Sequence, residues 1–143
     1  MSITRSLAAL LLATIPIAVA SSDDKVDPAT LKDKVTIGLG KKLVILFELK
    51  GNSLSNPKVV EKPRDKPPTP SFDLRKMDDN LILTTKNPFQ KDLTFRALAR
   101  LKGRKDYFET SIVPVKSGLL SFELWQDPIE ELVLFEFKLM DEE

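Results

Sequence analysis

The chain has 143 residues, with 22 basic and 21 acidic side chains, no cysteine and no histidine. It therefore forms no disulfide, carries no thiolate nucleophile, and lacks both the commonest metal ligand and the usual general base. A net charge close to zero argues against nucleic acid as the main partner, and the length suits one compact domain.

The first 20 residues have the organisation of a cleavable export signal. A short segment with one positive charge, Arg5, precedes an apolar run over residues 7–19, and Ala18 and Ala20 place small side chains where a signal peptidase reads them. The apolar run has about 13 residues, fewer than the roughly 20 that cross a bilayer as a helix. We therefore predict a signal peptide over residues 1–20, and an uncleaved N-terminal anchor is the alternative.

The composition of the remaining chain favours a bacterial compartment. Without the leader, 21 basic and 21 acidic residues remain. Small extracellular domains of eukaryotes usually depend on disulfides, and no Asn of this sequence lies in a glycosylation motif. No later segment is apolar enough to cross a membrane. We expect a secreted or periplasmic protein that does not span the membrane.

Residues 21–34 are polar and mixed in charge, and we expect a mobile leader in which Asp27 and Pro28 could start one helical turn. From Val35 onward, short apolar-polar alternations are separated by turn residues. The alternation is clearest over residues 93–101, where apolar side chains share one face of an extended chain. The expected strands cover residues 35–39, 43–49, 59–62, 72–77, 81–85, 93–101, 107–113, 119–125 and 133–139.

This spacing predicts one all-β domain over residues 35–140. About seven to nine short antiparallel strands without a long helix fit an immunoglobulin-like β-sandwich, and a small closed β-barrel is the alternative. Most of the eight phenylalanines fall at inward positions, and we expect Phe95, Phe122 and Phe137 in the interior. Trp125, the only tryptophan, lies beside a turn, where we expect it to cap one end of the sandwich or to form a single contact point.

Four prolines lie close together before the strand expected at residues 72–77. Because proline fixes φ and favours extended neighbours, residues 62–70 are expected to be exposed and polyproline-like. The segment either docks onto a partner with an aromatic-lined groove or forms a stiff connection between strands. The candidate docking residues are Pro63, Pro67, Pro68 and Pro70.

Charge is unevenly distributed along the chain although the total is balanced. Residues 86–116 carry eight basic and three acidic side chains, whereas residues 117–143 carry one basic and eight acidic ones. The basic block either contacts an anionic partner or pairs with acidic strands of the same sheet, and self-association of the basic and acidic ends is a third alternative. The candidate contact residues are Arg96, Arg100, Lys102, Arg104 and Lys105.

The sequence contains no recognisable motif for catalysis or cofactor binding: it has no phosphate-binding glycine loop, no nucleophilic serine motif and no spaced calcium ligands. We therefore expect no cofactor, no metal and no catalytic residue. The function that fits best is a non-catalytic binding module of the bacterial envelope, which contacts a protein or an anionic envelope component through a sheet face and loops. A self-associating structural element that forms a homo-oligomer is one alternative, and a small hydrolase using carboxylates such as Glu130 and Glu131 is another.

Overall fold

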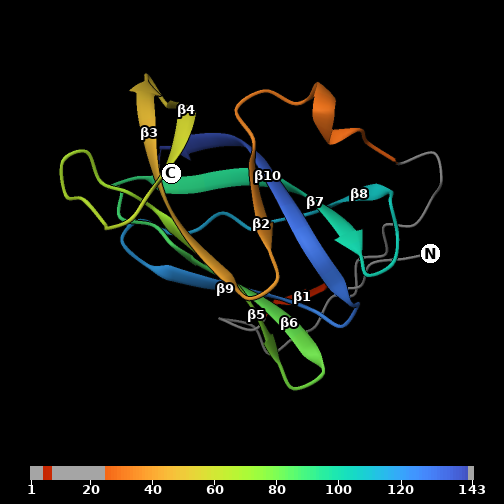
Figure 1. The fold of residues 1–143 in the computed structure, drawn as a ribbon. Helices are drawn as coiled ribbons and strands as arrows, with labels where there is room; N and C mark the ends of the chain where they lie inside the picture. The colour runs from red at the N-terminus through yellow and green to blue at the C-terminus, as the bar shows by residue number, and fades with distance from the viewer. Residues whose placement is uncertain (1–4, 8–24, 142–143) are drawn as a thin grey trace.

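The computed structural model describes residues 5–7 and 25–141, which contain ten β-strands and one short 3-10 turn (Figure 1). The turn, η2, spans Pro28–Thr30. Nine of the strands, β2 to β10, lie within the predicted domain of residues 35–140. The prediction of an all-β, antiparallel domain is confirmed. The strands are β1 (Arg5–Leu7), β2 (Val35–Gly38), β3 (Lys41–Lys50), β4 (Ser53–Val60), β5 (Ser71–Met77), β6 (Asn80–Lys86), β7 (Asp92–Leu101), β8 (Tyr107–Thr110), β9 (Leu120–Trp125) and β10 (Ile129–Met140).

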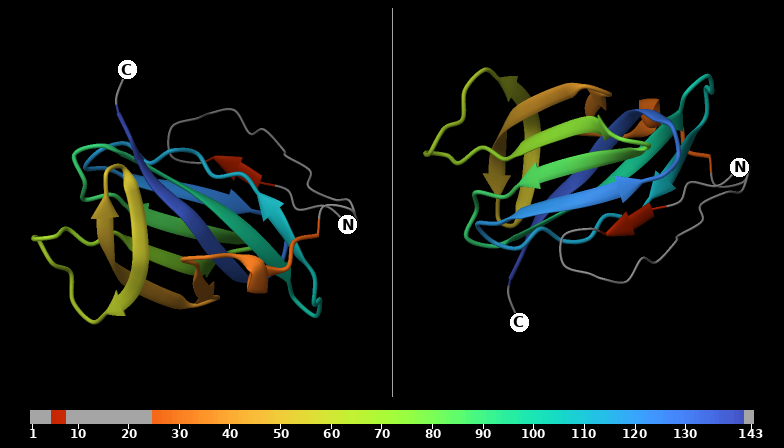
Figure 2. Two further views of the ribbon diagram at one scale, coloured as in Figure 1. Left: turned by 90° about the horizontal axis from the view of Figure 1, so that it is seen from above. Right: turned by 90° about the horizontal axis from the view of Figure 1, so that it is seen from below.

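The strands pair in one continuous path, in the order β1-β9-β6-β5-β3-β4-β10-β7-β8, with β2 attached to β10. β10 pairs with β7 along one edge and, along the other, first with β2 and then with β4 at Lys138. β3 pairs with β5 through residues 41–44 and with β4 from Val44 onward, so the path bends at these strands. Figure 2 shows the resulting half-barrel, in which β5, β6 and β9 face β10 and β7 across the interior. This curled sheet has the facing layers of a sandwich and the continuous pairing of a barrel.

Four phenylalanines from four strands meet at the centre of the core. The ring of Phe137 on β10 lies 4.7 Å from that of Phe47, 5.9 Å from that of Phe72 and 5.7 Å from that of Phe95, measured between centroids. All four side chains are buried. Edge-to-face and offset contacts of this kind add to the free energy gained by burying the rings. The expectation that Phe95 and Phe137 lie in the interior is therefore confirmed.

β9 presents the opposite face to the core from the one expected. Phe122 is half-buried on the outer face, whereas Glu123 is 1% exposed and Trp125 is 0% exposed. Their polar groups have partners inside: the Glu123 carboxylate accepts a hydrogen bond from the Val113 N–H at 3.0 Å, and the Trp125 indole N–H donates to the Thr110 hydroxyl at 3.0 Å. The expectations that Phe122 lies in the interior and that Trp125 caps one end of the sandwich or forms a single contact point are therefore wrong. Alternation within β9 does not show the hydrogen-bond partners that Val113 and Thr110 provide in the core.

Residues 25–34 pack onto the outer face of β7 and β10 instead of forming a mobile leader. The Val26 N–H donates to the Tyr107 carbonyl at 3.1 Å, which fixes the segment beside β8. Val26 and Leu31 contact a second apolar cluster on this face. β7 and β10 therefore have apolar contacts on both faces, with the main core on one side and this second cluster on the other. The buried members of the second cluster are Leu98, Val133 and Phe135.

The N-terminal expectations are tested in part. The helical turn expected at Asp27 and Pro28 is present as η2, where the Asp27 carboxylate accepts a hydrogen bond from the Ala29 N–H at 3.0 Å. Apart from β1, the predicted signal peptide of residues 1–20 and its cleavage site lie outside the described residues. Across the ranges that the structure describes, no helix has both the length and the apolar character to traverse a bilayer.

Asp92 fastens the long connection between β8 and β9 to the start of β7. Its carboxylate pairs with the Lys116 ammonium at 3.1 Å and accepts a hydrogen bond from the Ser117 N–H at 3.0 Å. The hydrogen bond from Lys116 and that from Ser117 hold the pKa of Asp92 below its ordinary value of 3.8. The charged carboxylate therefore stabilises the folded state.

Asp92→Asn is expected to reduce stability at neutral pH, with an effect that shrinks in acid. The folded-state pKa lies below the unfolded one, so the stabilisation is present above about pH 4 and is lost as the pH falls through the lower folded-state value. Urea midpoints of both proteins, measured at a series of pH values from neutral to acid, check this. Asp79→Asn, at an exposed turn position, is the control. A difference that is the same at every pH would contradict the assignment.

Candidate functional site

The predicted contact residue Arg96 lies on the outer face of β7 between two carboxylates. Its guanidinium bonds Glu109 of β8 at 2.7 and 2.5 Å, and Glu136 of β10 at 3.1 Å. It also lies 5.0 Å above the ring of Phe135. Hydrogen bonds with Glu109, followed by those with Glu136, raise the pKa of Arg96 above its ordinary value despite partial desolvation. Arg96 is thus the centre of a three-strand ion-pair ladder.

Arg100 forms a second ion-pair group four residues further along the same face of β7. Its Nε lies 3.4 Å from a Glu131 carboxylate oxygen, and a terminal nitrogen lies 3.8 Å from Glu130. The Tyr107 hydroxyl donates to the same Glu131 carboxylate. Partial burial and this carboxylate raise the pKa of Tyr107. Desolvation opposes the charge on Arg100, but its contacts with Tyr107 and the two glutamates raise its pKa overall.

The turn that joins β7 to β8 carries the other three candidate residues. Lys102, Arg104 and Lys105 are all exposed. In the region covered by the structure, no ion pair or side-chain hydrogen bond joins any of the three to a carboxylate. The Arg104 carbonyl, in contrast, accepts a hydrogen bond from Arg100 at 3.2 Å, which ties the turn to the ion-pair groups. The structure therefore divides the five predicted residues into two neutralised arginines and three cations that face solvent, which we call the basic turn.

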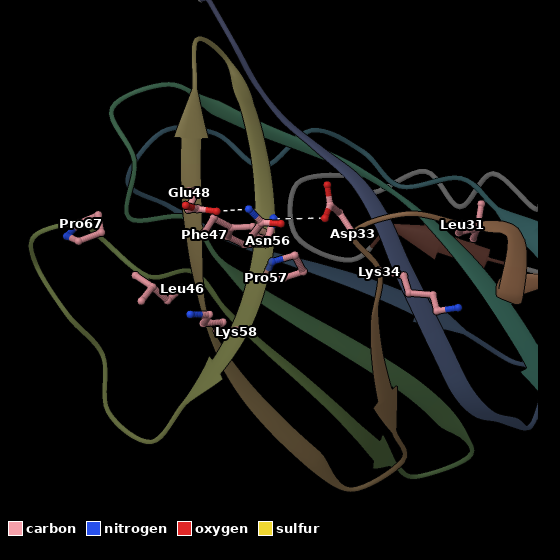
Figure 3. Close-up of a pocket in the computed structure, with 10 residues that line it drawn as sticks. All are labelled: Leu31, Asp33, Lys34, Leu46, Phe47, Glu48, Asn56, Pro57, Lys58 and Pro67. Atoms are coloured by element: carbon pink, nitrogen blue, oxygen red, sulfur yellow. Dashed lines mark hydrogen bonds between the residues drawn. The ribbon is translucent and has the colours of Figure 1, made fainter.

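An open groove of about 780 Å³ lies between the β3–β4 hairpin and the chain before β2 (Figure 3). Asn56 joins its two walls: its backbone N–H donates to the Asp33 carboxylate at 3.2 Å, and its side-chain amide donates to the Glu48 carboxylate. Asn56 lies at a bulge and has a φ of 49°, a conformation that Asn tolerates better than most residues. The groove is lined by Leu31, Asp33, Lys34, Leu46, Phe47, Glu48, Asn56, Pro57, Lys58 and Pro67.

The polar groups of this groove are largely committed to the fold. Both carboxylates accept hydrogen bonds from Asn56, and the Lys34 ammonium donates to the Pro28 carbonyl at 2.6 Å. Among residues 5–7 and 25–141, no three Asp or Glu side chains gather as a metal site requires. The groove is therefore a weaker candidate for recognition than the basic turn.

The four prolines of the predicted docking segment belong to a compact loop between β4 and β5. Asp65 and Pro68 form an antiparallel bridge, so the chain folds back on itself between them. The Pro70 carbonyl accepts a hydrogen bond from the Ile45 N–H at 3.0 Å, which fixes the end of the loop to β3. A folded loop thus replaces the polyproline-like conformation expected for residues 62–70. Pro63 and Pro67 are exposed, Pro68 is half-buried and Pro70 is buried.

Sequence reasoning missed the groove around Asn56. The dipeptide Asn56-Pro57 is a turn signal, whereas the structure holds it inside β4, where the bulge absorbs both residues.

Comparison with known proteins adds no further assignment, because no family model, no curated protein and no solved structure matches this chain. The candidate site is therefore defined by its own geometry: three exposed cations on a hairpin turn, next to two arginines that are already paired.

Proposed function

We propose that the protein is an exported, non-catalytic binding module of the bacterial envelope, which recognises an acidic partner through the basic turn. The observation that carries this proposal is the contrast between β7 and the turn that follows it: Arg96 and Arg100 have carboxylate partners, whereas Lys102, Arg104 and Lys105 face solvent. Exposed charges of one sign attract a complementary surface and increase the rate of association. The partner is a protein with an acidic face or another anionic component of the envelope.

The position of the basic turn supports this proposal. The turn lies at the tip of the β7–β8 hairpin, and the Lys102 N–H donates to the Pro128 carbonyl at 2.8 Å. The Arg104 N–H donates to the Leu101 carbonyl at 3.0 Å, which closes the turn. A turn fixed in this way holds the backbone of these residues in place before binding, so less backbone conformational entropy is lost on association.

The alternative of a carboxylate-dependent hydrolase has less support. Glu130 and Glu131 both lie within ion-pair distance of Arg100, and Glu131 also accepts a hydrogen bond from Tyr107. Both carboxylates are therefore engaged in ion pairs with a strand of the same sheet. Glu130→Gln and Glu131→Gln, assayed separately, should leave any hydrolysis by a purified preparation unchanged.

Charge reversal in the basic turn is expected to weaken binding and to flatten its dependence on salt. Each exposed ion pair contributes about 0.2–1 kcal/mol, so the double variant Arg104→Glu/Lys105→Glu should bind roughly two- to thirtyfold more weakly. The measurement is capture of envelope components by the immobilised protein at increasing salt, quantified by mass spectrometry. Lys41→Glu/Lys42→Glu is the matched control, because it makes the same charge change at exposed positions of β3. Equal losses in both variants would contradict recognition by the turn.

A further inference from the structure

The outer edge of β9 is covered by a segment that belongs to the predicted signal peptide. β9 pairs with β6 through all six of its residues. On its other edge, within the described part of the chain, β1 pairs antiparallel with residues 123–125 (Figures 1 and 2). If residues 1–20 are removed on export, as the proposed function requires, β1 leaves with them. The backbone N–H and C=O groups on this edge then have no strand beside them.

β9 lacks three of the features that usually protect an edge strand, although its inward-pointing Glu123 is a fourth such feature. Such strands commonly carry proline, outward lysine or a bulge, which block pairing with another chain. The sequence of β9 contains no proline and no basic residue, and its one charged residue, Glu123, points into the core. The opposite end of the path is better covered, because Lys25 forms a bridge with Phe108 of β8. Removal of β1 therefore opens the β9 edge specifically.

The outer face of β9 is apolar as well. Leu120 is 52% exposed, and Phe122 and Leu124 are half-buried on the same face. Leu124 pairs across the strands with Ile82 of β6, which extends the apolar strip onto the neighbouring strand. Burial of a strip like this stabilises a complex in proportion to the apolar area removed from water. An open edge and an apolar face thus lie side by side.

We propose that, after loss of the leader, β9 pairs antiparallel with β9 of a second copy, so that two half-barrels form one continuous sheet. Two identical strands that pair antiparallel are related by a two-fold axis, which closes the assembly as a dimer. The outer face of β9 carries no charge, so the apolar side chains of the two copies meet there without like charges. The one charged side chain of the strand, Glu123 on the inner face, accepts a hydrogen bond from the Val113 N–H of its own copy. The pairing of β1 supports this geometry, because it places an antiparallel strand at the same edge.

This dimer gives the proposed binding function a second contact point. Each copy contributes one basic turn, and the turns lie on β7–β8, at the other end of the strand path from β9. Both turns therefore remain free when the β9 edges pair. Two linked contacts bind a partner with repeated charges more tightly than one contact does, provided that both engage.

The experiment compares the chain from Ser21 with the chain that retains residues 1–20, by sedimentation velocity from micromolar to millimolar concentration. The described core is built from residues 26–139, so the shorter chain keeps every buried cluster. We expect it to dimerise with increasing concentration and the longer chain to remain monomeric. In the dimer, backbone amides of residues 120–125 should exchange with deuterium more slowly than in the monomer. The proposal is overturned if the shorter chain is folded but stays monomeric at every concentration. That result is the one expected if the β9 edge pairs with a strand of another protein instead of a second copy.

Leu120→Lys and Met77→Lys form a matched pair for the test. The two residues are 52% and 50% exposed, but Leu120 lies on β9 and Met77 on β5, two strands away. Because an unpaired charge in an apolar interface is costly, we expect Leu120→Lys to weaken dimerisation at least about a hundredfold, whereas Met77→Lys leaves it unchanged. Equal effects, or none, overturn the β9 assignment. The proposed function is tested separately by Arg104→Glu/Lys105→Glu, which should lose capture of the partner while the dimer stays intact. Removal of the leader is tested separately by the mass of the exported protein.

Discussion

Phe137→Ala is expected to lower the free energy of unfolding by about 3–5 kcal/mol, as is usual when a large aromatic side chain is truncated in a close-packed core. Phe137 contacts the rings of Phe47, Phe72 and Phe95, which come from three other strands. The truncation removes these contacts together and leaves a cavity that the curled sheet cannot fill without moving strands. Urea denaturation of wild type and variant, followed by circular dichroism, measures the difference.

Leu49→Ala is the control for this truncation. Leu49 is 57% exposed near the end of β3, so its truncation should change the free energy of unfolding by less than about 0.5 kcal/mol. The slope of the free energy against urea should stay the same in all three proteins, because the amount of surface exposed on unfolding is nearly unchanged. Similar losses at both positions would mean that the four-phenylalanine cluster does not dominate the core.

Thr110→Val is expected to lower the free energy of unfolding by about 1–3 kcal/mol, although the substitution preserves the shape of the side chain. The Thr110 hydroxyl accepts the hydrogen bond of the Trp125 indole at 3.0 Å, and both side chains are buried. Valine leaves the indole N–H without a partner in a site that water does not reach. Trp125 is the only tryptophan of the chain, so its fluorescence during urea denaturation reports directly on this site.

Thr36→Val provides the comparison for Thr110→Val. Thr36 lies at an exposed position of β2, where loss of the hydroxyl removes no buried hydrogen bond. Its expected effect is within about 0.5 kcal/mol of zero. If the two valine variants unfold at the same urea concentration, the bond between β8 and β9 contributes nothing measurable to stability.

Alternation in the sequence predicted those strands in which the apolar side chains recur at every second position and so share one face. Residues 93–101 were expected as a strand because their apolar residues recur every second position, and β7 spans Asp92–Leu101. The interior positions of Phe95 and Phe137 followed from the same period. Alternation indicates the wrong face for β9, because the more polar face, with Ser121, Glu123 and Trp125, is the one that points into the core. The choice between the two faces depends on Val113 and Thr110, which supply hydrogen-bond partners from elsewhere in the chain.

The candidate site was predictable in composition but not in pairing. The sequence identified the basic residues and left open whether they meet acidic strands or an external partner. Which of these holds for Arg96 depends on the register of β7 with β8 and β10, which places Glu109 and Glu136 beside it. The packing of residues 25–34 was missed for a related reason. A polar segment with two apolar side chains, Val26 and Leu31, becomes ordered through contacts with an apolar cluster on the outer face of the sheet.

The central position of β10 has a consequence for biosynthesis. β10 pairs with β2, β4 and β7, and it supplies Phe137 to the aromatic cluster. A chain that emerges from the ribosome therefore cannot complete this core until residues 129–140 have been synthesised, because the strands that precede them lack their common neighbour. Delayed closure of this kind keeps the polypeptide unfolded until its synthesis is nearly complete, which is the state that the export proposed above would require.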